Sequence, residues 1–342
     1  MQVVCEATQN PSVAVQVGAF ECLVRIMSLY YDRMALYMEQ ALFGVSHFFS
    51  SVLFLKFVHS FLFPPFASSL QLTVVGMRHS DERVALQAVE FWSTVCEEEV
   101  DLAIEAQEVR PPFLRFLALN TNRVRKKAQE YGDIPETESK FFAKIALPEI
   151  VPVLLTLLTR QEDDAEDDEW NVSMAAATCL ALLAGAVQDS VVPAVIPFIE
   201  AHIKSGDWHQ REAAIMTFGS ILEGPDPAVL KPLVDQALPL LIDMMTDSNL
   251  HVKDTTAWTL GRICDLLIAS IKPDVHLHPL ISALVTGLQD SPRIVANCCW
   301  ALMNLADQYG IYYEDDGEPP QNGPLSPYYE GVVQALLRVT DR

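Results

Sequence analysis

Apolar residues recur along the chain with the spacing of helices that bury one face. Val252, Thr256, Leu260 and Ile263 stand at offsets 0, +4, +8 and +11, which places them on one side of a helix. Five other stretches fit the same frame, and their first residues are Val15, Val84, Val172, Gln210 and Ile294. The pattern predicts six copies of one amphipathic helix, here called the frame helix.

The spacing between copies indicates the fold class. The +8 residues of successive copies are 69, 88, 38, 42 and 42 residues apart, and a second apolar helix is expected between copies, for example over 191–205, 229–246 and 277–289. Two helices in a period near 40 are typical of HEAT or armadillo repeats, whereas ankyrin and tetratricopeptide periods are shorter. We therefore expect an all-α protein, a single right-handed α-solenoid of HEAT-type helical hairpins over 1–342 with about six repeats.

Two spacings exceed the period, which predicts atypical insertions at 44–72 and 109–132. Seven phenylalanines lie between positions 48 and 66, but the apolar run 48–63 is shorter than the roughly 20 residues of a membrane span. The alternatives are a surface insertion packed on its own helix pair, or translated intron sequence that was never selected to fold here. The second segment is rich in Lys and Arg, and a nucleic-acid or localisation patch is a weaker alternative for it.

The net charge restricts the kinds of partner that the chain can bind, and the cysteines indicate the compartment in which it works. The net charge is −22, so we expect no nucleic acid and no membrane as partner, and a basic protein instead. The 7 cysteines include no CxxC pair, which is typical of reduced thiols inside a cell.

The segment 161–169 is predicted to be an acidic loop between a helix at 147–159 and the frame helix that starts at Val172. Carboxylates fill seven of eight positions: Glu162, Asp163, Asp164, Glu166, Asp167, Asp168 and Glu169. The run is either a solvated surface loop or a docking loop for a Lys/Arg-rich partner, and Trp170 directly after it favours docking. No metal site is expected, because the EF-hand spacing with its central glycine is absent.

Two tryptophans stand out at offset +6 of the frame, opposite the core positions. The residues at this slot are Glu21, Glu90, Thr178, Met216, Trp258 and Trp300. In a two-layer solenoid this face lines the concave surface. Asp254 precedes Trp258 by four residues and Asn297 precedes Trp300 by three, so each indole is predicted to have a polar neighbour that suits a lysine or arginine stem. The alternative is that both indoles pack between adjacent repeats, as Trp92 at a core position is expected to do within its own repeat.

No residue pattern indicates catalysis. The chain has no GxGxxG, GxxxxGK or GxSxG string, and the histidines at 276 and 278 and the cysteine pair at 298 and 299 are better explained by packing or capping. We expect no enzymatic activity, no cofactor and no metal.

Several strings resemble the importin-β family of HEAT-repeat nuclear transport receptors. They are FWSTVC at 91–96, EWN at 169–171, ILEGP at 221–225, DTTAWTLGRIC at 254–264 and NCCW at 297–300. The resemblance covers nearly the whole chain except 44–72 and 109–127. It corresponds to the middle of that receptor, roughly its fifth to tenth repeats.

The resemblance implies a nuclear import receptor segment and its partners. The acidic loop matches one that contacts Ran and basic cargo. Trp170, Trp258 and Trp300, with Asp254 and Asn297, match the residues that clamp the basic helix of importin-α or a basic nuclear localisation signal. Tyr37 matches part of a pocket for Phe-Gly nucleoporins, which the insertion at 44–72 is expected to weaken. The implied location is the cytoplasm and nucleus, with the nuclear envelope at its pores. The alternative function is a generic HEAT-repeat scaffold, such as a phosphatase regulatory subunit.

Overall fold

The computed structural model describes residues 2–46, 69–108, 138–161, 170–309 and 323–340. Throughout these ranges the ordered elements are helices, and the chain divides into two compact units. The first unit comprises Met1–Leu157 and Ala165–Val187, and the second comprises Leu158–Asp164 and Gln188–Arg342.

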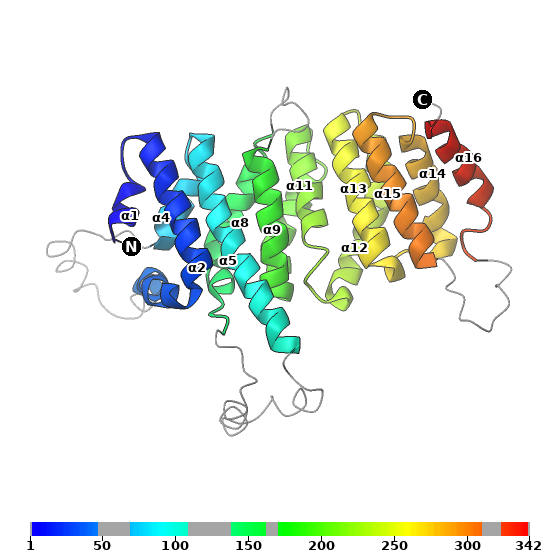
Figure 1. Ribbon diagram of the computed structural model, residues 1–342. Coiled ribbons are helices and arrows are strands. Elements are labelled where there is room, and N and C mark those ends of the chain that lie inside the picture. The colour runs from blue at the N-terminus through cyan, green and yellow to red at the C-terminus, as the bar shows by residue number, and fades with distance from the viewer. Residues whose placement is uncertain (1, 47–68, 109–137, 162–169, 310–322, 341–342) are drawn as a thin grey trace, which may run out of the picture. The chain divides into compact units, whose positions relative to one another are not determined.

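In the first unit, helices α2, α5 and α9 contact one another in sequence and form a row, while α4 packs on α5 and α8 packs on α9 (Figure 1). The row contains the first three predicted frame helices, and α2 has a kink at Tyr30. The helices of this unit are α1 (Gln2–Ala7), α2 (Val13–Ser46), α4 (Ser69–Met77), α5 (Glu82–Glu108), α8 (Phe142–Leu157) and α9 (Val172–Val187).

The second unit repeats this arrangement. Helices α11, α13 and α15 form the row, and α10, α12 and α14 pack on them as the second layer. The helices are α10 (Val192–His202), α11 (Trp208–Ser220), α12 (Pro227–Met244), α13 (Leu250–Leu266), α14 (His278–Gly287), α15 (Pro292–Tyr309) and α16 (Tyr329–Thr340). Short helical turns lie at Gln188–Val191, Ile268–Ser270 and Pro273–Leu277. Each unit is thus a stack of helical hairpins, as the sequence predicts.

Short polar side chains set the starts of several helices. The carboxylate of Asp207 accepts from the backbone N–H of His209, and Asn249 accepts from the backbone N–H groups of His251 and Val252. Asp226 caps α12 in the same way, directly before a proline at the first helical position. Such caps satisfy N–H groups that have no partner inside the helix. Helices α11, α12 and α13 therefore begin where the sequence supplies a capping side chain.

The predicted core positions are confirmed in most copies. All four core positions of the frames that begin at Val84, Val172, Val252 and Ile294 are buried. Trp92 is completely buried, and its indole N–H donates to Thr73 Oγ1 at 3.1 Å, so its structural role is confirmed. Val15 is an exception, because it is 42% exposed in the first turn of α2.

The two predicted insertions fall largely outside the described residues. Positions 47–68 and 109–137, as well as the acidic run 162–169, are not described. Two described segments, Val13–Tyr31 and Val172–His202, are long and apolar enough for a membrane span by length and composition. The second contains a break at Gln188, where φ is 51°. Core helices of folded proteins meet the same criterion, so it is weak evidence for a span.

Candidate protein-binding site

The +6 positions of the frame helices lie toward solvent in the first unit. Glu21 on α2, Glu90 on α5 and Thr178 on α9 are exposed. In the second unit Met216, Trp258 and Trp300 at the same slot are half-buried. The slot thus lies away from the buried core positions, as the spacing predicts, but Trp258 and Trp300 are less exposed than the residues at this slot in the first unit.

A glycine on the preceding frame helix explains the half-burial. The six-membered ring of Trp258 lies against Gly219 of α11, and that of Trp300 lies against Gly261 of α13. A Cβ at either glycine would overlap the indole atoms Cζ3 and Cε3. Each indole thus packs against the preceding helix of the row, as the alternative of packing between adjacent repeats predicts. Both tryptophans nevertheless remain partly exposed.

The polar neighbours of the two indoles bind each other. Asn297 Nδ2 donates to Asp254 Oδ1 at 2.8 Å, which links α15 to α13. Arg293 also contacts Asp254, with 3.1 Å between Nη2 and Oδ2. The sequence predicted a polar neighbour for each indole but not that Asp254 and Asn297 bind each other. The result is one polar cluster that joins α13 and α15.

Arg262 lies beside Trp258, and the sequence analysis missed it. Its Cζ is 5.4 Å from the indole centroid, and its Nη2 is 3.2 Å from Glu223 Oε2 in the turn after α11. The i,i+4 spacing to Trp258 is the signal that could have found this residue.

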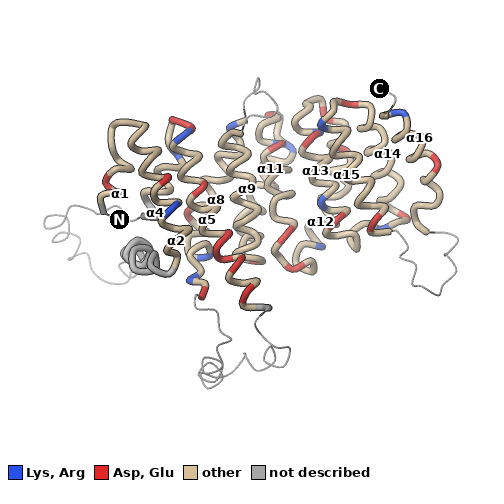
Figure 2. Tube along the Cα trace, viewed as in Figure 1, with Lys and Arg blue, Asp and Glu red and all other residues tan. Residues whose placement is uncertain are grey.

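Trp170 is 55% exposed at the start of α9 and lines a groove of about 420 Å³ in the first unit. Glu21 and Glu90, the +6 residues of α2 and α5, line the same groove, together with Arg25. The structure thus places an exposed indole near two carboxylates that the frame predicted on this face. Figure 2 shows further acidic residues along the C-terminal half of α5.

The base of the acidic run is attached to a buried carboxylate. Gln161 Nε2 donates to the side chain of Glu212 and to the backbone oxygen of His209. Thr255 Oγ1 on α13 donates to Glu212 at 2.6 Å. Burial raises the pKa of Glu212 to about 7, although the two donated hydrogen bonds lower it. This cluster fixes residue 161, while the carboxylates at 162–169 lie outside the described residues.

A second buried carboxylate also escaped the sequence analysis. Glu99 on α5 accepts from the hydroxyl of Tyr31 at 2.7 Å and from the backbone N–H of Phe142 at 2.6 Å. Burial raises the pKa of Glu99 and that of Tyr31. Glu99 continues the apolar stripe of α5 one turn beyond Val95, so an acid on a core face was the available signal. Its role is to cap the N-terminus of α8.

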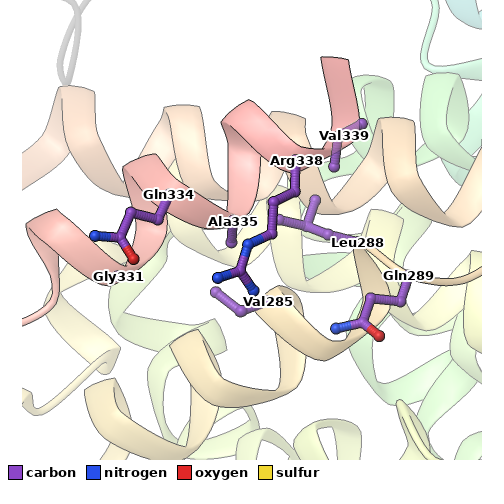
Figure 3. Close-up of a pocket in the computed structure, with 8 residues that line it drawn as sticks. All are labelled: Val285, Leu288, Gln289, Gly331, Gln334, Ala335, Arg338 and Val339. Atoms are coloured by element: carbon purple, nitrogen blue, oxygen red, sulfur yellow. The ribbon is translucent and has the colours of Figure 1, made fainter. Parts of the chain in front are cut away.

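A further groove of about 400 Å³ lies between α14 and α16. Arg338 of α16 extends toward Val285 of α14 and Leu288, the residue directly after that helix (Figure 3). Within the described part of the chain, α16 has no buried residue. Tyr37 lies on α2, but its side chain is outside the described part.

Of the four groups that sequence analysis assigned to packing or capping, Cys298 and His276 are buried, Cys299 is partly buried and His278 is exposed beside the ring of Tyr328. Cys298 is buried, and burial raises its pKa to about 12. His276 is buried, and its Nδ1 accepts from the backbone N–H of Lys272 at 3.2 Å. Among the described residues no three His, Cys, Asp or Glu side chains form a metal-binding group.

Comparison with known proteins identifies the family. The family model for the HEAT-like repeat matches residues 208–263, and the family model described as importin subunit beta-1-like, TPR repeats, matches residues 279–342. Importin subunit beta-1 of Schizosaccharomyces pombe is 47% identical over 342 residues, which cover 100% of this chain and 34% of that protein. The chain belongs to the importin-β family.

Other importin-β proteins agree in sequence and in structure. Importin subunit beta-1 of Saccharomyces cerevisiae is 39% identical, over 100% of this chain and 33% of that protein. A crystal structure of importin-β from ammonium sulfate matches with a TM-score of 0.80 and 42% identity, again over 100% of this chain and 33% of the other. The chain therefore spans about a third of the length of the importin-β proteins that it matches.

Two solved complexes of yeast importin-β, Kap95p, are also similar. The complex in which Kap95p binds RanGDP has a TM-score of 0.76, and the complex of Kap95 with Nup1 has a TM-score of 0.77. Both are 37% identical and cover 100% of this chain and 33% of the other. The HEAT-type fold and the family resemblance stated from the sequence are thus confirmed.

Proposed function

We propose that this chain is the cargo-binding segment of a nuclear import receptor, and that it binds a Lys/Arg-rich helix such as that of importin-α, or a basic nuclear localisation signal. The observation that carries the proposal is the repetition of a partly exposed indole, Trp258 and Trp300, in adjacent repeats. The cluster of Asp254 and Asn297 lies between the helices that carry them.

The chemistry of this face suits a basic helix. The methylenes of a lysine or arginine stack on an indole, while the cationic head needs a carboxylate or an amide oxygen. Because the two tryptophans stand one repeat apart, a basic helix that follows the row meets an indole twice, with the Asp254–Asn297 pair linking the two helices that carry them. Within the first unit, Trp170 lines a groove together with Glu21 and Glu90, which is a separate place with the same chemistry. The seven carboxylates of 162–169 add negative charge.

The structural relatives support two further partners for the complete receptor. One similar yeast structure is a complex with RanGDP and another is a complex with Nup1. We assign Ran and nucleoporins as partners of the full-length protein, with Tyr37 in the nucleoporin pocket and 162–169 in the Ran and cargo contact. The corresponding location is the cytoplasm and nucleus, with passage through nuclear pores.

The test is to replace each tryptophan by alanine and to measure the affinity for a synthetic Lys/Arg-rich amphipathic helix. Trp258→Ala and Trp300→Ala should each weaken binding by about 2 kcal/mol, the size of an interface hot spot. Both indoles are half-buried, so melting is measured in parallel and a modest loss is expected.

Trp92→Ala is the matched control. Truncation of this fully buried indole should destabilise the fold by about 3–5 kcal/mol and leave the affinity of the folded fraction unchanged. If all three variants lose stability equally and the folded fractions of Trp258→Ala and Trp300→Ala bind as tightly as before, the two indoles are packing residues and the proposal is wrong.

The alternative, a generic HEAT-repeat scaffold, makes a different prediction. A scaffold that joins proteins through other surfaces has no need of an indole pair on this face, so both alanine variants would leave partner binding intact. The same binding assay therefore separates the two functions.

A further inference from the structure

The ring of Trp258 already has a cation beside it. The guanidinium carbon of Arg262 lies 5.4 Å from the centroid of the indole, which is within cation–π distance. Arg262 follows Trp258 by four residues on α13, so helix geometry brings the two side chains to the same face. Glycine at 219 lets another part of the indole pack against α11.

A carboxylate on the neighbouring turn holds Arg262 in this place. Its Nη2 is 3.2 Å from Oε2 of Glu223, and the Arg262 side chain is only 17% exposed. The Nε of Arg262 is buried and has no hydrogen-bond partner among the described residues. A buried donor without an acceptor costs free energy. Arg262 therefore lies beside the indole with one of its hydrogen-bond donors unsatisfied.

Trp300 has a different neighbour at the equivalent position. The residue four places after it is Asn304, which is buried and donates to the backbone oxygen of Gly261 at 3.1 Å. Asn304 is uncharged and its amide donates to the backbone, so it does not supply the Trp300 ring with a cation in the way that Arg262 does for Trp258. The two indoles are therefore alike in their packing on glycine and unlike in their polar neighbour.

We propose that Arg262 is an internal occupant of the cation site on Trp258, so that a ligand lysine or arginine reaches this indole only by displacing it. Trp300 is the indole that accepts a ligand cation without displacement. When Arg262 moves away, Glu223 is released to pair with the incoming cation. This inference rests on the proposed function, because it names the residue that sets the selectivity of the same site.

The test compares Arg262→Gln with Arg83→Gln in binding to the same synthetic basic helix. Both substitutions remove one positive charge, but Arg83 is 71% exposed and pairs with Asp81 in the first unit. Arg262→Gln should tighten binding by about three- to tenfold, the scale of one cation–π contact. Arg83→Gln should change the affinity less than about twofold, because it alters only the long-range field.

The gain must depend on the indole. In a Trp258→Ala background, Arg262→Gln should have no larger effect than Arg83→Gln. If Trp258→Ala weakens binding but Arg262→Gln leaves the affinity unchanged or lowers it, Arg262 positions the indole for the ligand instead of occupying its site, and the inference is overturned.

A readout without the peptide separates this inference from the proposed function. The indole N–H signal of Trp258, assigned in the NMR spectrum with Trp258→Phe, is followed during titration with methylguanidinium. The signal should respond at several-fold lower concentration in Arg262→Gln than in the parent chain. Equal responses overturn the inference, and this holds even if neither tryptophan contributes to peptide binding and the proposed function fails.

Discussion

Glycines on two frame helices decide where the indoles of the neighbouring helices lie. Gly219 and Gly261 leave the space that Trp258 and Trp300 fill. A single added methyl group at either position overlaps the ring, so the indole must move outward or the helices must separate. These glycines act through close packing, and both lie inside helices where alanine would otherwise be preferred.

Gly261→Ala is therefore expected to destabilise the chain by about 1–3 kcal/mol and to weaken binding of a basic helix, because Trp300 is displaced. Gly18→Ala is the matched control, since nothing lies within 4 Å of a Cβ at that position of α2. It should stabilise the chain by about 0.5–1 kcal/mol through helix propensity. Chemical denaturation of both variants checks the pair, and equal effects would contradict the packing role of Gly261.

At the scale of elements, Glu212 connects α11 to α13 and to the residue before the acidic run. Its neighbours Thr255 and Gln161 both direct donors toward it. Because burial raises its pKa to about 7 from an ordinary value of 4.5, the folded chain holds a proton that the unfolded chain releases between these values. The contribution of Glu212 to the free energy of unfolding is complete below pH 4.5 and declines as the pH rises to about 7.

The prediction is that stability falls between about pH 5 and pH 7 by up to about 1.4 kcal/mol per pH unit from this group. Glu212→Gln should remove this slope, because the amide does not titrate. Urea denaturation of the two chains at several pH values gives the difference between them, in which other titrating groups cancel. Parallel curves for the two chains would show that Glu212 keeps an ordinary pKa.

The segments 44–72 and 109–132 interrupt a repeat pattern that is otherwise regular. We predict that deletion of residues 44–70 and 109–127 stabilises the chain, since the first segment is rich in phenylalanine and a large apolar patch that reaches solvent favours aggregation. Soluble yield and melting temperature of the deleted and intact chains are the measurements. A clear loss of stability on deletion would mean that both segments are integrated structure.

At the scale of the whole molecule, the net charge of −22 governs the approach of a partner. Affinity for a basic helix should fall as salt rises, because exposed charges are screened over about 10 Å at 0.1 M ionic strength. The contribution of the indoles should persist at high salt, since stacking of methylenes on a ring is not screened in the same way. Titrations at low and high salt with the parent chain and Trp300→Ala test this. If the affinity of Trp300→Ala no longer depended on salt, the charge and indole contributions would not be independent, and the prediction would be wrong.

The amino-acid pattern predicted the repeat and the core because both depend on local periodicity. A frame of four apolar positions is enough to place Trp92 or Leu260 in the interior, since one face of a helix must be buried in any stacked hairpin. Glu99 continues such a stripe and was missed only because carboxylates are rarely buried. The prediction that Val15 is buried was wrong, because the periodicity of one helix does not report which other helices cover it.

From the sequence alone, the period near 40 residues predicted the fold class, strings such as DTTAWTLGRIC at 254–264 gave the family resemblance, and the spacing along one helix placed Trp258 and Trp300 away from the core positions. The tertiary structure alone shows that the indoles pack on Gly219 and Gly261, that Asp254 meets Asn297, and that Arg262 reaches Glu223. These contacts join residues about 40 positions apart in adjacent repeats. Their geometry depends on how closely two helices approach, which is set by the size of the side chains between them.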